Sequence, residues 1–164
     1  MLKLGLVRHA KSSWSSPQLI DHDRPLNNRG VRDAPVMAKQ VLKLFGVPDL
    51  LVSSTAKRAL TTAKVFKKEM KLTDDKLEEI AELYHASIED TMEVISEIQE
   101  DAKFAMIFGH NPTMTYLANS FPGDMIDNVP TCGVLLLESS ASSWDNVNIS
   151  NTKRLDFIYP KMYV

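Results

Sequence analysis

The sequence contains one cysteine, Cys132, among its 164 residues. A single cysteine excludes an internal disulfide and a zinc site built from this chain's cysteines alone, which favours a reducing compartment. No stretch approaches the roughly 20 consecutive apolar residues that a membrane helix requires. The first residues follow a strand pattern with a basic residue inside it and lack the apolar core of a signal peptide. We therefore expect a cytoplasmic protein with no membrane partner.

The sequence also lacks an excess of charge of either sign. It has 19 Lys and Arg against 21 Asp and Glu, for a formal net charge of −2. No segment concentrates Lys and Arg as a binder of nucleic-acid phosphates would, so nucleic acid is not an expected partner. Internal repeats and long low-complexity runs are absent too. With 44% hydrophobic residues at this length, we expect one well-buried domain over residues 1–164.

Short apolar runs alternate with amphipathic stretches along the chain. We expect strands over 2–7, 50–53, 77–80, 104–108, 134–137 and 152–158, and helices over 28–45, from 54 or 55 to about 70, over 88–98, and from 112 onward. Pro35 falls inside the first helical pattern, where its missing N–H predicts a late start or a kink. Ser54 or Thr55 can cap the second helix, and Asn111 the last. The alternation predicts an α/β fold, a three-layer helix-sheet-helix sandwich whose sheet is mostly parallel with one antiparallel member.

Cationic or potentially cationic side chains follow three of these strands. Arg8 and His9 end the first, Arg58 falls in the first turn of the helix after the second, and His110 follows the fourth. The carboxyl ends of parallel strands border the ligand crevice, so the fold gathers these residues. Two guanidinium forks and two imidazoles make a phosphate pocket, and a neutral imidazole nitrogen can attack phosphorus.

Residues 6–14, Leu-Val-Arg-His-Ala-Lys-Ser-Ser-Trp, resemble the Arg-His-Gly opening motif of the histidine phosphatase (phosphoglycerate mutase-like) superfamily. Residues 21–30, Asp-His-Asp-Arg-Pro-Leu-Asn-Asn-Arg-Gly, are similar to its SixA-type phosphohistidine phosphatase branch, and residues 53–63 and 109–111 continue the family order. The resemblance implies a phosphoglycerate mutase-like fold and no metal or cofactor. It also implies roles for the site residues: His9 as nucleophile, His110 in contact with the phosphoryl group, and Arg8 and Arg58 as phosphate ligands.

Several positions allow two interpretations. Many relatives carry a carboxylate after the third strand as general acid; Glu82 lies in that region, although the SixA-type branch lacks this acid. Arg24 could reach the pocket rim or brace Asp21 or Asp23. His22 and His85 are interpreted as surface or structural histidines.

The resulting prediction is a metal-independent phosphatase that hydrolyses phosphohistidine, or another phosphorylated substrate, through a covalent phospho-His9 intermediate. Its expected partner is a phosphorylated protein or a small phosphorylated molecule. One alternative is a phosphoglycerate mutase-type isomerase. Another is a catalytically silent phosphate-binding module, because Ala10 stands where the family motif has Gly and its Cβ could crowd the phosphate loop.

Overall fold

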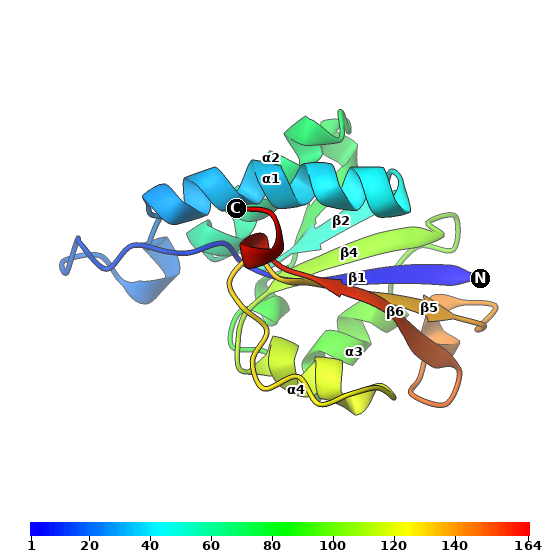
Figure 1. Cartoon of the computed structure of the whole chain (residues 1–164). Helices are drawn as coiled ribbons and strands as arrows, with labels where there is room; N and C mark the ends of the chain where they lie inside the picture. The colour runs from blue at the N-terminus through cyan, green and yellow to red at the C-terminus, as the bar shows by residue number, and fades with distance from the viewer.

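The computed structural model describes all 164 residues, and its centre is a six-stranded sheet with the order β3-β2-β4-β1-β5-β6 (Figure 1). The strands are β1 (Leu2–Arg8), β2 (Leu50–Ser53), β3 (Leu77–Glu79), β4 (Phe104–Gly109), β5 (Val134–Ser139) and β6 (Thr152–Ile158). β1, β2, β3 and β4 pair in parallel, whereas β5 is antiparallel to both β1 and β6. The prediction of a mostly parallel sheet with one reversed member is confirmed.

Helices cover both faces of the sheet and make the three predicted layers (Figure 1). α1 (Asn28–Phe45) and α2 (Lys57–Glu69) lie on one face, and α3 (Ile88–Ser96) and α4 (Thr113–Ser120) on the other. Successive residues of a strand point to opposite faces, and β4 shows this division. Its Met106 and Phe108 join the apolar cluster beneath α1 and α2, while Ile107 joins the cluster beneath α3 and α4. Burial on both faces explains the continuous apolar runs of the sequence.

α1 has the bounds predicted from the sequence, and a cap residue stands at each end. The Asn27 side chain accepts a hydrogen bond from the Gly30 N–H, and Gly46 ends the helix with a φ of +86°. Positive φ suits glycine because it has no Cβ. Pro35 lies inside the helix, seven residues after its first residue, so the expectation of a late start was wrong.

Two other helix starts differ from the prediction. α2 begins at Lys57, with Ala56 as its N-cap, so neither Ser54 nor Thr55 caps it. The Ser54 hydroxyl instead accepts from the Ala56 N–H at 3.2 Å, within a tight turn before the helix. α4 begins at Thr113, one residue later than expected, with Pro112 at the N-cap position.

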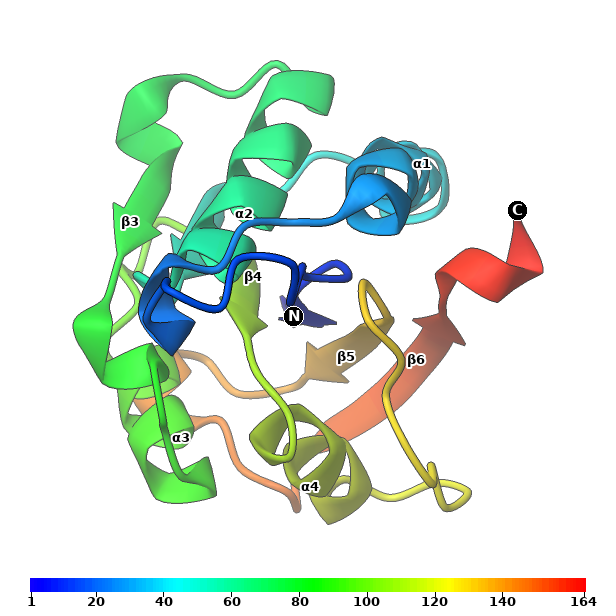
Figure 2. The same cartoon turned by 90° about the vertical axis from the view of Figure 1, so that its left-hand side faces the viewer.

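The carboxyl ends of β1, β2, β3 and β4 meet at one edge of the sheet, which faces the viewer in Figure 2. Three irregular segments converge on this edge: residues 10–27, residues 80–87, and residues 121–133 before β5. The edge therefore brings together residues from most of the length of the chain.

Candidate active site

His9 follows β1 directly and is 7% exposed. Its Nδ1 lies 2.7 Å from the Ala10 carbonyl oxygen. A carbonyl oxygen can only accept, so Nδ1 carries the proton and the Nε2 lone pair is available. Burial, reinforced by the positive charge of Arg58 and other arginines, lowers the pKa of His9 to about 4. The ring is therefore neutral at neutral pH, the form in which imidazole is a nucleophile.

His110 follows β4, with its ring centroid 5.2 Å from that of His9. Its Nε2 lies 2.8 Å from the Ser54 hydroxyl, which already accepts from the Ala56 N–H. The hydroxyl can then donate its hydrogen to Nε2, which leaves the ring proton on Nδ1. Nδ1 is buried and has no hydrogen-bond partner. Burial, followed by the repulsion that a second proton on the His9–His110 pair would meet and by the charge of Arg58, lowers the pKa of His110 to about 3, so this ring is a neutral donor.

Arg8 and Arg58 each keep part of the guanidinium group free of protein partners. Arg58 donates Nη1 to the Asp21 carbonyl at 2.8 Å and Nη2 to Asp21 Oδ2 at 2.9 Å, and Arg8 donates Nη1 to the Val129 carbonyl at 3.0 Å. The Nε of both arginines is buried without a partner. The guanidinium edge formed by Nε and Nη2 can grip two oxygens of a phosphoryl group at once. An unsatisfied buried donor costs about 1–3 kcal/mol, and an anion bound here would remove that cost.

Asp21 anchors Arg58 from the short 3-10 turn Asp21–Asp23. Its carboxylate also accepts from the Tyr84 hydroxyl at 2.6 Å and from Arg24 Nε at 3.0 Å. The hydrogen bond from Tyr84, followed by those from Arg24 and Arg58, holds the pKa of Asp21 well below its usual range. Asp21 is therefore a permanent carboxylate that fixes the position of Arg58.

Arg24 braces this loop. Besides Asp21, its guanidinium donates to the Ser12 hydroxyl at 2.8 Å and the Ser13 carbonyl at 3.2 Å. Its Cζ lies 3.6 Å from the centre of the Trp14 ring. Of the two roles that the sequence allows for Arg24, these contacts are those of a brace on Asp21.

Thr62 ties the chain after His9 to the helix that carries Arg58. Its hydroxyl accepts from the Ala10 N–H at 3.0 Å and donates to the Arg58 carbonyl at 2.7 Å. The Ala10 side chain is fully buried in the apolar cluster beneath α1 and α2, and its φ is not positive. Its methyl group therefore packs in the core, and the suggested crowding of a phosphate loop has no structural basis.

All four histidines of the chain belong to one connected set of rings at this edge. Tyr84 is its centre, with ring centroids 4.9 Å from His22, 3.9 Å from His85 and 5.6 Å from His110. This arrangement differs from the expectation that His22 and His85 are surface or structural residues, and it adds Tyr84, which no sequence motif indicates. Their position in the chain could have indicated Tyr84 and His85, because residues 80–87 follow the end of β3 as the other site residues follow the ends of their strands.

A cavity of about 360 Å³ opens beside His110 and Arg58, and Tyr84 and His85 are part of its wall. Glu82 is exposed and does not line this cavity, so the carboxylate considered as a general acid lies outside it. No group of three or more His, Cys, Asp or Glu side chains in the chain could hold a metal ion. No helix combines the length and the apolar character needed to cross a membrane.

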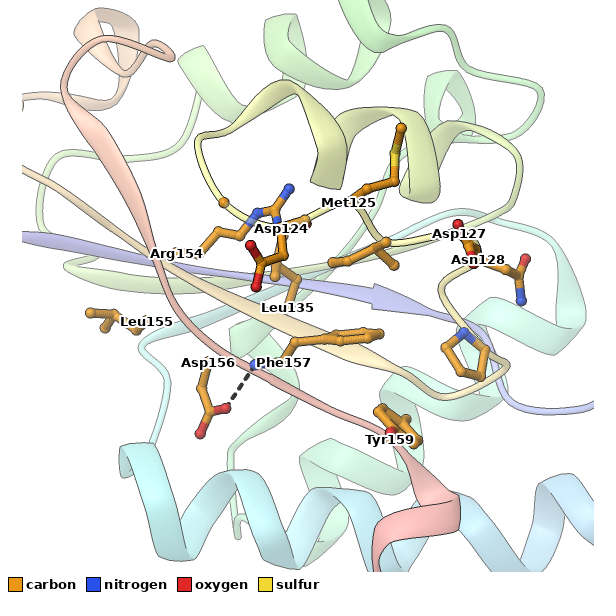
Figure 3. A pocket seen from close by; sticks show the side chains of 13 residues that line it. Asp124, Met125, Asp127, Asn128, Leu135, Arg154, Leu155, Asp156, Phe157 and Tyr159 are labelled. Carbon is orange, nitrogen blue, oxygen red and sulfur yellow. Dashed lines mark hydrogen bonds between the residues drawn. The ribbon is translucent and has the colours of Figure 1, made fainter.

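A larger cavity of about 660 Å³ lies elsewhere, between residues 123–130 and β6 (Figure 3). Asp124 and Met125 reach it from the segment before β5, and Arg154 and Phe157 from β6. None of the four predicted site residues lines it. The two regions are neighbours: Asn111, which lines the smaller cavity, donates to Asn128, which lines the larger one, at 3.0 Å.

Comparisons with known proteins identify the family of this chain. The family model of the histidine phosphatase superfamily (branch 1) matches residues 4–121. An uncharacterised chloroplastic protein of Arabidopsis thaliana is 32% identical over 154 residues, which cover 87% of this chain and 69% of that protein. An uncharacterised protein of Mycobacterium leprae is 26% identical over 171 residues, covering 94% and 100% of the two chains.

Two solved structures resemble this chain over nearly its whole length. A protein of Agrobacterium tumefaciens assigned as the phosphohistidine phosphatase SixA superimposes with a TM-score of 0.81 at 28% identity, over 97% of this chain and 98% of that one. The protein histidine phosphatase SixA in complex with tungstate gives a TM-score of 0.82 at 17% identity, over 98% and 99% of the chains. The second likeness is one of fold.

Proposed function

This chain belongs to the histidine phosphatase superfamily, and we propose that it hydrolyses phosphohistidine through a covalent phospho-His9 intermediate, without a metal ion. One observation carries the proposal. A neutral His9 stands beside three buried donors without partners: Nε of Arg8, Nε of Arg58 and Nδ1 of His110. Such donors are suited to the oxygens of a phosphoryl group.

The chemistry takes two displacements at phosphorus. In the first, Nε2 of His9 attacks, the bond from phosphorus to the substrate nitrogen breaks, and the bond to His9 forms. Arg8, Arg58 and His110 hold the phosphoryl oxygens while their negative charge is redistributed, the kind of fixed electrostatic support that is often the largest catalytic contribution. In the second, water attacks phosphorus, phosphate leaves, and Nε2 recovers its lone pair.

Phosphohistidine is the favoured substrate class because of its leaving group. An imidazole can leave protonated, so the enzyme need not supply a strong acid. The cavity beside His110 contains no carboxylate in its wall, which suits this substrate better than an alkyl phosphate ester or a mutase reaction. The 28% identity to the Agrobacterium tumefaciens protein supports the same class. The proposal treats residues 1–164 as one domain that acts in the cytoplasm on a phosphorylated protein.

The test is hydrolysis of a radiolabelled phosphohistidine-bearing protein by the wild type, His9→Gln and Glu82→Gln, each with a chelator present. We expect label on His9 and phosphate release in the wild type and in the exposed control Glu82→Gln, and neither in His9→Gln. Label on another residue, or release that survives His9→Gln, would refute the assignment. Mutase turnover without hydrolysis would favour the isomerase, and phosphate binding without turnover the silent module.

A further inference from the structure

Three rings stand beside the phosphoryl-binding residues, at the end of β3. The Tyr84 ring packs against His85 at 3.9 Å with 36° between the planes, and meets His22 edge-on at 4.9 Å with 83° between them. Its centroid is also 5.6 Å from that of His110. The two displacements at phosphorus use none of the rings of Tyr84, His85 and His22.

The Tyr84 ring is fixed relative to the phosphoryl site. Its hydroxyl donates to Oδ2 of Asp21 at 2.6 Å, and the same oxygen accepts from Arg58 Nη2 at 2.9 Å. The Arg58 Cζ lies 5.9 Å from the ring centroid. Oδ2 of Asp21 thus fixes the positions of both the Arg58 guanidinium and the Tyr84 ring.

His85 reaches the same side as Tyr84 because of its backbone. Neighbouring residues of an extended chain point to opposite sides, and Tyr84 itself is extended. His85 has a φ of +57°, which turns its side chain back onto the Tyr84 ring. A left-handed conformation is uncommon for residues other than glycine, although Asn, Asp and His adopt it more readily than most. His85 stays exposed and lines the cavity together with Arg58 and His110.

We propose that Tyr84 and His85, supported by His22, form a leaving-group subsite that receives a planar aromatic ring. This inference rests on the proposed function and specifies its substrate. Arg58 and His110, which would hold the phosphoryl group, line the same cavity as Tyr84 and His85, whereas Arg8 and His9 do not. A leaving group that extends from the phosphoryl group into this cavity has Tyr84 and His85 as its neighbours. The cavity, at about 360 Å³, falls in the range of small-molecule sites. Aromatic side chains favour a planar ring through stacked or edge-on contacts, and they offer nothing comparable to ammonia or a small alcohol.

The experiment compares two substrates that share a phosphorus–nitrogen bond and differ in the leaving group: phosphoimidazole, which releases imidazole, and phosphoramidate, which releases ammonia. The readout is the ratio of their kcat/KM values. His85→Asn removes the ring and tolerates positive φ. We expect it to lower the ratio by about threefold to tenfold, the rate equivalent of one aromatic contact. His85→Phe keeps a ring without a titratable nitrogen, and we expect it to retain the ratio.

Glu82→Gln is the matched control, because Glu82 is exposed nearby and lines no part of the cavity. A ratio that His85→Asn leaves unchanged, or that falls equally in His85→Phe, would overturn the subsite. If the wild type hydrolyses both substrates with label on His9, and the His85 variants leave the ratio of kcat/KM values unchanged, the subsite is wrong and the proposed function stands. If the wild type hydrolyses neither, the proposed function fails and the subsite with it.

Discussion

Arg58 donates to Asp21 twice, from Nη1 to the backbone carbonyl at 2.8 Å and from Nη2 to the carboxylate at 2.9 Å. The two residues are 37 positions apart, and the pairing holds the loop after β1 against the first turn of α2. The ion pair occupies one end of the guanidinium and leaves the edge with Nε for a ligand. In the proposed mechanism, Asp21 is therefore the residue that positions Arg58 for phosphoryl binding.

Replacing Asp21 with Asn should weaken phosphoryl binding without unfolding the protein. The Asp21 side chain is 42% exposed, so its ion pair with Arg58 is partly screened by solvent. We expect kcat/KM to fall by about tenfold, with a similar weakening of vanadate inhibition, because hydrogen bonds to charged groups contribute about 1.5–3 kcal/mol before that screening. Asp23→Asn is the control on the same turn, since Asp23 is 57% exposed and contacts only His22 at 3.5 Å. Equal losses in the two variants would contradict the role of Asp21.

Thr62→Val should destabilise the fold considerably more than Thr62→Ser. Thr62 is fully buried, and valine has nearly its shape but leaves the Ala10 N–H without an acceptor. We expect the free energy of unfolding to drop by about 1–3 kcal/mol in urea denaturation. Serine keeps the hydroxyl and should recover most of the loss. An unchanged urea midpoint in Thr62→Val would show that the link between Ala10 and α2 is dispensable.

The two site histidines should titrate far below an ordinary histidine. Burial lowers the pKa of His9 to about 4 and that of His110 to about 3, from 6.5. Unfolded histidines take up protons as the pH falls through 6.5 while the folded ones do not, so stability should decline from about pH 6.5 toward about pH 4. NMR titration of the ring resonances, assigned with His9→Gln and His110→Gln, measures this directly. A midpoint near 6.5 for either ring would mean that its burial does not suppress protonation.

Gly30→Ala should disturb the segment after His9. A Cβ built on Gly30 lies 2.2 Å from the Lys11 carbonyl oxygen, so helix or loop must move. We expect a loss of about 1–3 kcal/mol in the free energy of unfolding, typical of forced overpacking, together with reduced phosphatase activity. Val31→Ala changes an exposed neighbour in the same turn and should stay within about 0.5 kcal/mol. A Gly30→Ala protein with wild-type activity and stability would mean that the loop accommodates the methyl group freely.

The sequence predicted the sheet, and the placement of Arg8, His9, Arg58 and His110 at its carboxyl edge, because these depend on local signals. Buried strands are mostly apolar runs, and Arg8, His9 and His110 lie at most two residues beyond such a run, so the fold places them at one edge. Arg58 follows from the same rule, since its helix begins close to the end of β2.

The residues that position this site depend on contacts distant in sequence. Residues 10–26 have no hydrophobic period, so nothing local indicates that Asp21 reaches Arg58. The Ser54 hydroxyl could cap a helix or form a hydrogen bond with a histidine. Only the tertiary structure shows that its partner is His110. His85 joins the site through a left-handed backbone conformation that a histidine permits but does not require.

The two arginines proposed to bind the phosphoryl group, Arg8 and Arg58, should differ in how they are inherited. Arg8 is held by the main chain: Nη1 by the Val129 carbonyl, and its own carbonyl by the Cys132 N–H. Every residue carries a carbonyl, so among descendants position 129 can drift between side chains of similar size while its hydrogen bond to Arg8 persists. Position 132 is more restricted, because proline lacks the N–H and Cys132 has a φ of +59°. Arg58 relies in part on the Asp21 carboxylate, so a lineage that loses one partner should have to compensate at the other.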